Sequence, residues 1–318
     1  YLYCFYNQLT SLNVTANTAL TYLYCNNNQL TSLNVTANTA LTYLFCNNNQ
    51  LTSLNVTANT ALTELHCYEN SLTLLNVTAN TALLSLECFN NQLTSLNVTA
   101  NTVLNNLYCG NNQLPSLNLA TNTALIYLDC RNNQLTSLNV TANMALTTLY
   151  CFNNQLTSLN VTANTALTYL GCSNNQLTLL NVQNGNNTNF QFFLATGNSS
   201  LTCIQVDNVA NFTTNWGAYI DLTTSFSTDC STFNNINTIP EDLGFTAYPN
   251  PTQGNLTLNI ANPKGDMIIE VRNVMGQLLQ SQNYVATATV ELKLAGASGI
   301  YFVTARTAVG EAVWKVVK

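Results

Sequence analysis

The residues of this chain that could carry chemistry are eleven cysteines and a single histidine. Regularly spaced thiols could form disulfides or bind a metal. A zinc site needs ligands that converge on one point. A disulfide needs Cβ atoms about 3.8 Å apart, whereas neighbouring strands lie about 4.8 Å apart. We therefore predict that the nine cysteines that recur at one fixed interval are buried apolar side chains, and we expect no metal and no cofactor. These are Cys4, Cys25, Cys46, Cys67, Cys88, Cys109, Cys130, Cys151 and Cys172.

The histidine, His66, lies within three residues of Glu64 and Glu69, and Glu87 follows it at the same 21-residue interval. A histidine beside carboxylates can act as a metal ligand or as an acid–base pair. The simpler interpretation is a surface pair worth under about 1 kcal/mol. No Ser–His–Asp pattern, phosphate-binding loop or glycine-rich dinucleotide turn occurs in the sequence. We therefore expect a non-enzymatic protein.

A 21-residue repeat places these side chains. Each copy reads L-x-x-L-x-C-x-x-N-x-L, as in 20–30, which is the leucine-rich-repeat signature. The pattern predicts a solenoid whose short strands stack into a parallel sheet on the concave face. Alternation along the strand directs Leu23 and Cys25 inward and Tyr22 and Tyr24 outward. The repeat resembles those of secreted Bacteroidetes surface proteins.

Interior residues behind the sheet are expected to be Leu30, Leu33 and Val35 in each copy. Asparagine should bond backbone groups left unpaired by the turn, in its own and the next repeat, in the column that begins at Asn7 and Asn28. A second column, Asn17 through Asn164, should do the same at the opposite corner.

The outward strand positions vary between copies, whereas the inward positions barely change. They hold most aromatic residues and, except for Glu69, all charged residues of the array, beside a column of asparagines that begins at Asn27. Exposed aromatic rings suit recognition, so we predict a face that binds protein or glycan. The alternatives are a structural stalk without a ligand and, remotely, an ice-binding protein. The predicted contact residues are Tyr22, Tyr24, Tyr43, Phe45, His66, Tyr68, Glu87, Phe89, Tyr108, Tyr127, Asp129, Arg131, Tyr150, Phe152 and Tyr169.

The repeats end near Leu180. We assign 1–180 to the solenoid, with its N-terminal cap and any signal peptide expected before Tyr1, and 181–233 to a C-terminal cap. A cluster of Phe190, Phe192 and Phe193 and a degenerate strand at 201–204 should close the array. The last two cysteines, Cys203 and Cys230, lie off the period in this loop-rich segment, so we predict a disulfide between them.

Charge and hydropathy exclude several classes of partner. Residues 1–243 carry one basic and nine acidic side chains, a net charge of −8, whereas residues 244–318 carry +2. Nucleic-acid binding requires lysine and arginine to displace counterions, so we expect no nucleic-acid partner. No run approaches the ~20 apolar residues of a membrane span. We expect a monomer.

Composition changes at a linker, 234–244, and residues 245–318 then show alternating runs separated by glycine turns, which predict a small β-sandwich. This region resembles the type A sorting domain of type IX secretion. The resemblance implies contact with that secretion machinery and release or attachment at the outer cell surface. The motif residues that carry it are Tyr248, Pro249, Asn250, Pro251, Gly254, Gly276, Gly299, Lys315 and Lys318.

Overall fold

The computed structural model describes residues 1–230, 245–260, 266–273, 277–285, 287–294, 297–307 and 310–318. The expected linker, 234–244, and Gly276 lie outside these described residues. The chain divides into two compact units, Tyr1–Cys230 and Ser231–Lys318. Each unit has its own core and is described separately.

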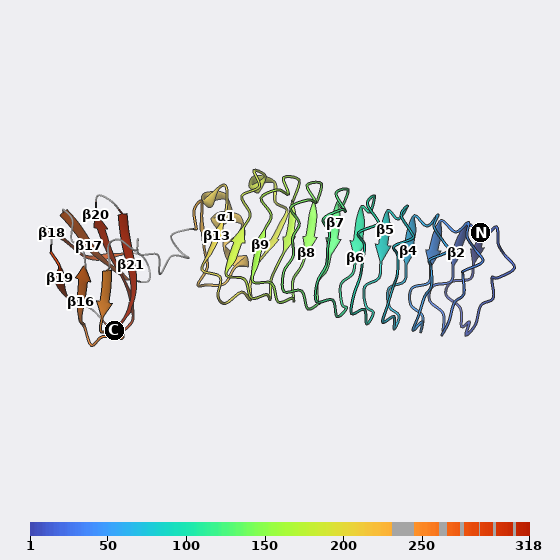
Figure 1. Cartoon of the computed structure of the whole chain (residues 1–318), viewed down its shortest axis with the longest axis horizontal. Coiled ribbons are helices and arrows are strands. Elements are labelled where there is room, and N and C mark those ends of the chain that lie inside the picture. Colours follow the sequence, from blue (N-terminus) through green and yellow to red (C-terminus); the bar gives the residue numbers. More distant parts are fainter. Residues whose placement is uncertain (231–244, 261–265, 274–276, 286, 295–296, 308–309) are drawn as a thin grey trace. The chain divides into compact units, whose positions relative to one another are not determined.

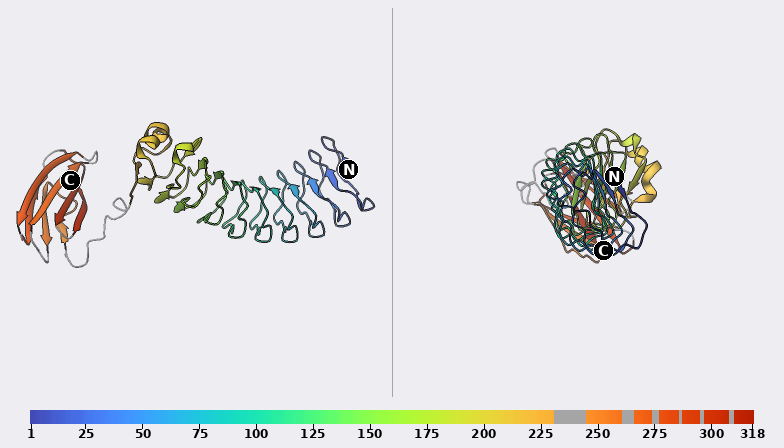
Figure 2. Two further views of the ribbon diagram at one scale, coloured as in Figure 1. Left: turned by 90° about the horizontal axis from the view of Figure 1, so that it is seen from above. Right: turned by 90° about the vertical axis from the view of Figure 1, so that its right-hand side faces the viewer.

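The first unit is a solenoid, and Figure 2 shows it as a curved stack of turns. One strand from each turn joins a parallel sheet of ten strands (Figure 1). The strands pair in register, Leu23 with Leu44 and Leu44 with Leu65, because each turn repeats the same sequence pattern. The predicted fold class is confirmed. The strands are β1 Leu2–Tyr3, β2 Tyr22–Tyr24, β3 Tyr43–Phe45, β4 Glu64–His66, β5 Ser85–Glu87, β6 Asn106–Tyr108, β7 Tyr127–Asp129, β8 Thr148–Tyr150, β10 Tyr169–Gly171 and β12 Phe192–Leu194.

The interior consists of identical residues stacked turn upon turn. Leu23, Cys25, Leu30 and Val35 are completely buried, and Leu33 is 7% exposed. These residues belong to one continuous hydrophobic core that runs from Val14 to Phe212. No single turn could bury its apolar side alone, so stacking supplies the stability of every turn.

Two columns of asparagine bond the backbone where the chain turns. Asn112 is buried; its Nδ2 donates to the Cys88, Cys109 and Gly110 carbonyls, and its Oδ1 accepts from Leu93 N–H. The partners lie in its own and the preceding repeat, so the expectation of a bond to the next repeat was wrong in direction. The carbonyl of Cys88 and the N–H of Leu93, both in the preceding turn, are the backbone groups that this side chain satisfies.

The second asparagine column lies at the other corner and is fully buried from Asn38 to Asn164, whereas Asn17 in the first turn is exposed. Asn38 Nδ2 donates to the carbonyls of Val14 and Asn17, again in the preceding turn, at 2.9 and 2.8 Å. Both columns are therefore structural.

A second parallel sheet and a short helix close the array. The sheet contains β9 Ser158–Asn160, β11 Leu179–Asn181, β13 Cys203–Gln205 and β14 Ser225–Ser227. Helix α1, Val209–Trp216, which no sequence pattern predicted, begins after the capping residue Asn208, whose side chain accepts from Asn211 N–H. The 3₁₀ turns η1 Asn187–Asn189 and η2 Gly217–Tyr219 flank this region.

The phenylalanine cluster of the cap differs from the expected one. Phe193 is completely buried against Phe212 of α1, with ring centroids 5.2 Å apart, and Phe190 joins them. Phe192 instead lies on the outer side of β12, where its ring meets Tyr150 edge to face at 5.9 Å. Alternation along the strand explains this split, because Phe192 and Phe193 must point to opposite sides.

The second unit contains two antiparallel sheets. One has the order β15-β16-β19, with β15 Phe245–Tyr248, β16 Asn255–Ile260 and β19 Thr289–Lys293. The other has the order β18-β17-β20-β21, with β17 Asp266–Asn273, β18 Leu278–Val285, β20 Ile300–Thr307 and β21 Gly310–Val317. Alternating residues such as Leu256, Ile269 and Val303 form their common core. Strand β15 precedes the proline-containing segment 249–251.

Among the described residues, no helix has the length and apolar character needed to cross a membrane.

Candidate functional site

The candidate site is the outer side of the ten-stranded sheet, called the sheet face below. Three columns of side chains form it: those at Tyr22, at Tyr24 and at Asn26 with their equivalents in the other turns. Every predicted contact residue lies on this face, and fourteen of the fifteen are half-buried. Asp129 is the exception, with 5% exposure. Parallel in-register stacking thus brings together side chains that lie one full repeat apart in sequence.

Aromatic rings on the sheet face stack on one another along the columns. The rings of Tyr22 and Tyr43 lie 4.5 Å apart and nearly parallel, at 8°. The Tyr68 and Phe89 rings lie 4.2 Å apart at 10°. Since each ring covers the flat face of its neighbour, such pairs direct mainly their edges and hydroxyl groups to solvent. In these two pairs the flat faces, on which sugar rings would stack, are therefore largely covered.

The asparagine column that begins at Asn27 occupies a turn position that requires a left-handed backbone conformation. Its members all have φ between 51° and 55°. Asparagine tolerates this left-handed conformation better than most residues. Side chains of neighbouring turns also bond each other, as Asn132 Nδ2 does with Asn111 Oδ1 at 2.6 Å. These amides are therefore less available to a ligand than the sequence alone suggests. The column consists of Asn27, Asn48, Asn90, Asn111, Asn132, Asn153 and Asn174.

Asp129 and Arg131 form an ion pair, with Arg131 Nε 3.1 Å from Asp129 Oδ2. The guanidinium also lies over the ring of Phe152, at 5.6 Å from its centroid. Gly110 leaves room for the pair, because a Cβ there would lie 3.0 Å from Arg131 Cγ. Burial raises the pKa of Asp129, while the neighbouring Arg131 lowers it. Asp129 therefore holds Arg131 in place, and only Arg131 of this pair reaches the surface.

His66 lies between two carboxylates and against an aromatic ring. Its Nε2 is 3.7 Å from Glu64 Oε2 and 3.6 Å from Glu87 Oε1, and its ring stacks on Phe45 at 4.0 Å. Burial lowers the pKa of His66 to about 4, and burial raises the pKa of Glu64 and Glu87. The imidazole is neutral at pH 7. Among the described residues, no three His, Cys, Asp or Glu side chains are grouped as metal ligands.

The cysteine column lies beneath the sheet face. Eight of its nine thiols are buried, and Cys4 in the first turn is partly exposed. Burial raises the pKa of Cys46 and of Cys88 to about 12. Because the thiolate is the nucleophile and the metal ligand, these thiols are chemically silent at neutral pH.

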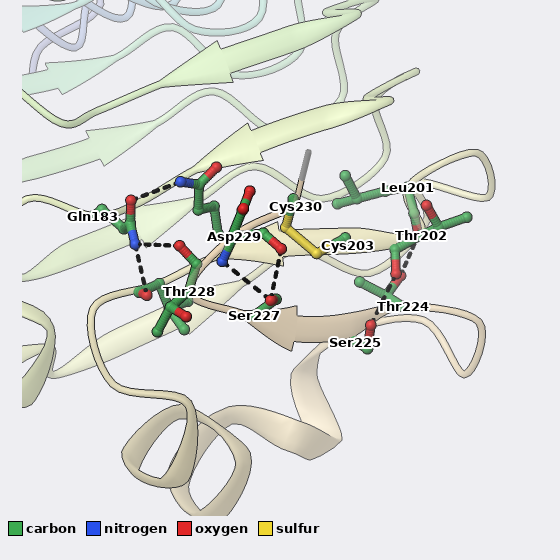
Figure 3. The surroundings of a disulfide bond; sticks show 12 residues. Gln183, Leu201, Thr202, Cys203, Thr224, Ser225, Ser227, Thr228, Asp229 and Cys230 are labelled. Atoms are coloured by element: carbon green, nitrogen blue, oxygen red, sulfur yellow. Dashed lines mark hydrogen bonds between the residues drawn. A yellow bond between two sulfur atoms is a disulfide. The ribbon is translucent and has the colours of Figure 1, made fainter. Parts of the chain in front are cut away.

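The two remaining cysteines form a disulfide. Cys203 of β13 and Cys230 lie side by side in the cap, with Cα atoms 5.8 Å apart. Figure 3 shows the bond beside the segment Ser227–Cys230, where Gln183 Nε2 also donates to the Thr228 carbonyl. The bond attaches the last described residue of the first unit to an internal strand of the cap.

The threonines considered for ice binding are engaged with their own turns. Thr36 and Thr78 donate their hydroxyl hydrogens to Asn34 and Asn76, two residues earlier, at 2.7 Å. Thr57 bonds Asn55 in the same way. These hydroxyl hydrogens are used within the molecule, which weighs against the ice-binding alternative.

The expected motif residues of the second unit come together from distant parts of its sequence. Asn250 and Gly254 lie beside β21, which contains Lys315, and Lys318 pairs with Gly299. Tyr248 is 49% exposed, and its hydroxyl group accepts from Asn259 Nδ2. Gly276 lies outside the described part of the chain.

Comparison with known proteins identifies both units. Residues 246–318 match the family described as "Secretion system C-terminal sorting domain". The functional domain of InlJ from Listeria monocytogenes, described as including a cysteine ladder, is 29% identical; the match covers 100% of this chain and 84% of that one, with a TM-score of 0.54. The leucine-rich repeat domain of APL1B is 21% identical over 70% of this chain and 72% of that one, also with a TM-score of 0.54. No curated protein sequence matches the chain.

These matches confirm the expectations drawn from the repeats and the tail. The sorting domain implies type IX export, a Bacteroidetes origin, and a location at the cell surface or outside the cell. The chain is a leucine-rich-repeat solenoid followed by a secretion system C-terminal sorting domain.

Proposed function

We propose that the exported solenoid is a non-enzymatic adhesion protein that binds a protein partner through its sheet face. The observation that carries this proposal is the contrast between columns. Interior residues repeat from turn to turn because packing requires it, whereas the outward columns vary and hold the aromatic and charged residues. A structural stalk needs no such variation on one face.

The stacking of the rings favours a protein partner over a glycan. The flat faces needed for sugar stacking are largely covered in the pairs Tyr22–Tyr43 and Tyr68–Phe89, and the carboxylates of Glu64 and Glu87 lie partly exposed on the same face. Half-buried aromatic side chains lose little conformational entropy on binding, which suits them as anchors at protein interfaces.

One strained residue also supports a binding role. The turn position that is asparagine in most copies is Glu69 in the fourth, with φ of 52°. This conformation costs a residue other than Gly, Asn or Asp about 1 kcal/mol or more. Strain of this kind persists most often at functional sites, and Glu69 adds an exposed carboxylate next to the His66 region.

Ring removal tests the proposal. The full-length protein is first screened against an array of purified extracellular-matrix proteins and glycans. The substitutions Tyr24→Ser, Phe45→Ser, Tyr108→Ser and Tyr150→Ser, made together, should abolish binding to the protein found, since a hot-spot aromatic side chain contributes about 2 kcal/mol or more. Circular dichroism and thermal unfolding establish that the variant remains folded.

The matched control changes four exposed threonines away from the sheet face: Thr31→Ala, Thr52→Ala, Thr94→Ala and Thr136→Ala. This variant should bind as the unaltered protein does. Binding that survives ring removal would favour the stalk. Binding to glycans alone would overturn the choice of a protein partner.

A further inference from the structure

The sorting domain holds its last strand with a clasp built from the start of the domain. Asn250 Nδ2 donates to the Lys315 carbonyl at 2.7 Å, and Asn250 Oδ1 accepts from Val317 N–H at 2.9 Å. Thr252 N–H donates to the Val317 carbonyl at 2.7 Å. One short segment, 250–252, therefore pairs with β21 although more than sixty residues separate them.

The clasp also joins the two sheets of the domain. β21 is an edge strand of the four-stranded sheet. The clasp segment contacts β21 and also the end of the three-stranded sheet. At that second contact, Leu294 N–H donates to the Gly254 carbonyl at 2.7 Å. The position of β21 relative to the other sheet thus depends on residues 250–254.

Lys318 also packs beside the clasp segment. Its Nζ donates to the Leu294 carbonyl at 3.0 Å, and its backbone exchanges two hydrogen bonds with Gly299. Gly254 has φ of +113°, and a Cβ there would lie 3.2 Å from Lys318 Cε. Glycine is therefore required at position 254 for two reasons. Its backbone conformation disfavours other residues, and the Lys318 side chain occupies the space that a Cβ would need.

Gly299 differs from Gly254 although both belong to the motif. A Cβ built on Gly299 meets nothing within 4 Å, and Gly299 does not have a positive φ. The clasp thus requires glycine at position 254, whereas position 299 has room for a larger side chain.

We propose that Asn250, Thr252 and Gly254 are positioning residues of the export signal, which hold the 315–318 segment in the conformation that the secretion machinery recognises. If the machinery recognised the last residues only as an extended sequence, hydrogen bonds from residues 250–254 to them would not be needed. The clasp positions the segment that is recognised, and this role does not depend on what the sheet face binds.

The test is export of the full-length protein from a type IX-competent bacterium, measured as the fraction outside the cell. Asn250→Ala removes two hydrogen bonds and Gly254→Ala displaces Lys318, so each should lower that fraction about tenfold. Asn250→Asp keeps the acceptor for Val317 N–H and loses the donor to Lys315, so its export should be intermediate. The controls Thr257→Ala and Thr289→Ala, which remove hydrogen bonds outside the clasp, should be exported like the unaltered protein.

Hydrogen exchange separates loss of the clasp from loss of the fold. In Asn250→Ala, amides of 315–318 should exchange faster, while those of β17 remain protected. Normal export despite faster exchange at 315–318 would overturn the proposal. Unchanged exchange at 315–318, or efficient export of a reporter that carries residues 300–318 alone, would overturn it as well.

Discussion

Burial controls the chemistry of His66. Its pKa of about 4 lies below the ordinary value of 6.5 because the imidazole is desolvated beneath Phe45 and between Glu64 and Glu87. The carboxylates act in the opposite direction, and desolvation outweighs them. An imidazole with this pKa is neutral over the whole physiological range and does not serve as a proton shuttle near pH 7.

We predict that the His66 imidazole titrates with a pKa of about 4 when followed by NMR, which a single histidine in the chain makes unambiguous. Because the folded pKa is lowered, the unfolded chain binds the proton more readily between about pH 4 and 6.5. This contribution to stability is therefore full above pH 6.5 and declines as the pH falls towards 4. A His66→Phe variant should lack the decline, and a titration near 6.5 would refute the desolvation argument.

The sequence revealed the positions of the candidate residues better than their roles. Strand alternation correctly placed Tyr22 and Tyr24 outward. It did not show that Asp129 would be buried, since that depends on Gly110 leaving space in the neighbouring strand. The sequence also could not predict that stacking covers the flat faces of some rings, because this depends on how side chains of neighbouring turns are oriented.

The turn after each strand imposes a backbone conformation that most residues resist. The array meets this demand with asparagine in seven copies, and Glu69 and Tyr6 are exceptions with φ of 52° and 51°. From the sequence alone, that column was interpreted as a polar part of the binding surface. Its regularity has a simpler origin in the left-handed backbone.

We expect Glu69→Gly to stabilise the solenoid by about 1 kcal/mol, since glycine adopts a positive φ without steric cost. Asn111→Ala should destabilise it by a similar amount. Both changes are measurable as shifts of the midpoint in urea unfolding. Destabilisation by Glu69→Gly would mean that the contact of Glu69 Oε1 with Asn90 outweighs the strain.

If Glu69 also contacts the partner, Glu69→Gly should weaken binding while it stabilises the fold. Such a trade-off is common where a strained residue serves function. Equal affinity in the two proteins would remove Glu69 from the proposed interface.

Most elements of the molecule were predictable because they repeat. The 21-residue period defined strands, interior and turns at once, and alternating runs in the tail predicted six of its seven described strands. Helix α1, strand β15 and strands β9, β11 and β14 of the second parallel sheet were missed. Helix α1 and strand β15 have no second copy in the sequence for comparison, and the short helix α1 shows too brief a pattern to be distinguished from a loop.

The charge of the whole solenoid predicts how it meets a partner. Residues 1–243 carry a net charge of −8, and Arg131, their one basic residue, is paired with Asp129. Glu64 and Glu87 remain on the sheet face, and Glu69 lies exposed at the adjoining turn. A protein partner is therefore expected to present lysine or arginine there, which accelerates association.

We predict that association weakens as salt rises, since screening shortens the reach of exposed charges from about 10 Å at 0.1 M to about 3 Å at 1 M. The double variant Glu64→Gln, Glu87→Gln should associate more slowly and respond less to salt. Surface plasmon resonance at several ionic strengths measures both effects. Association that is indifferent to salt would point to a contact made by the rings alone.

Interchangeable turns have a consequence for how such a chain changes over generations. Because each turn offers its neighbours the same leucines, thiol and amide, two copies of the repeat can recombine and add or delete whole turns without opening a gap. Copying errors in steps of one whole repeat would alter the span of the array and the order of the rings together. Duplication or loss of whole repeats can thus change what the sheet face binds without any change in the packing of the core.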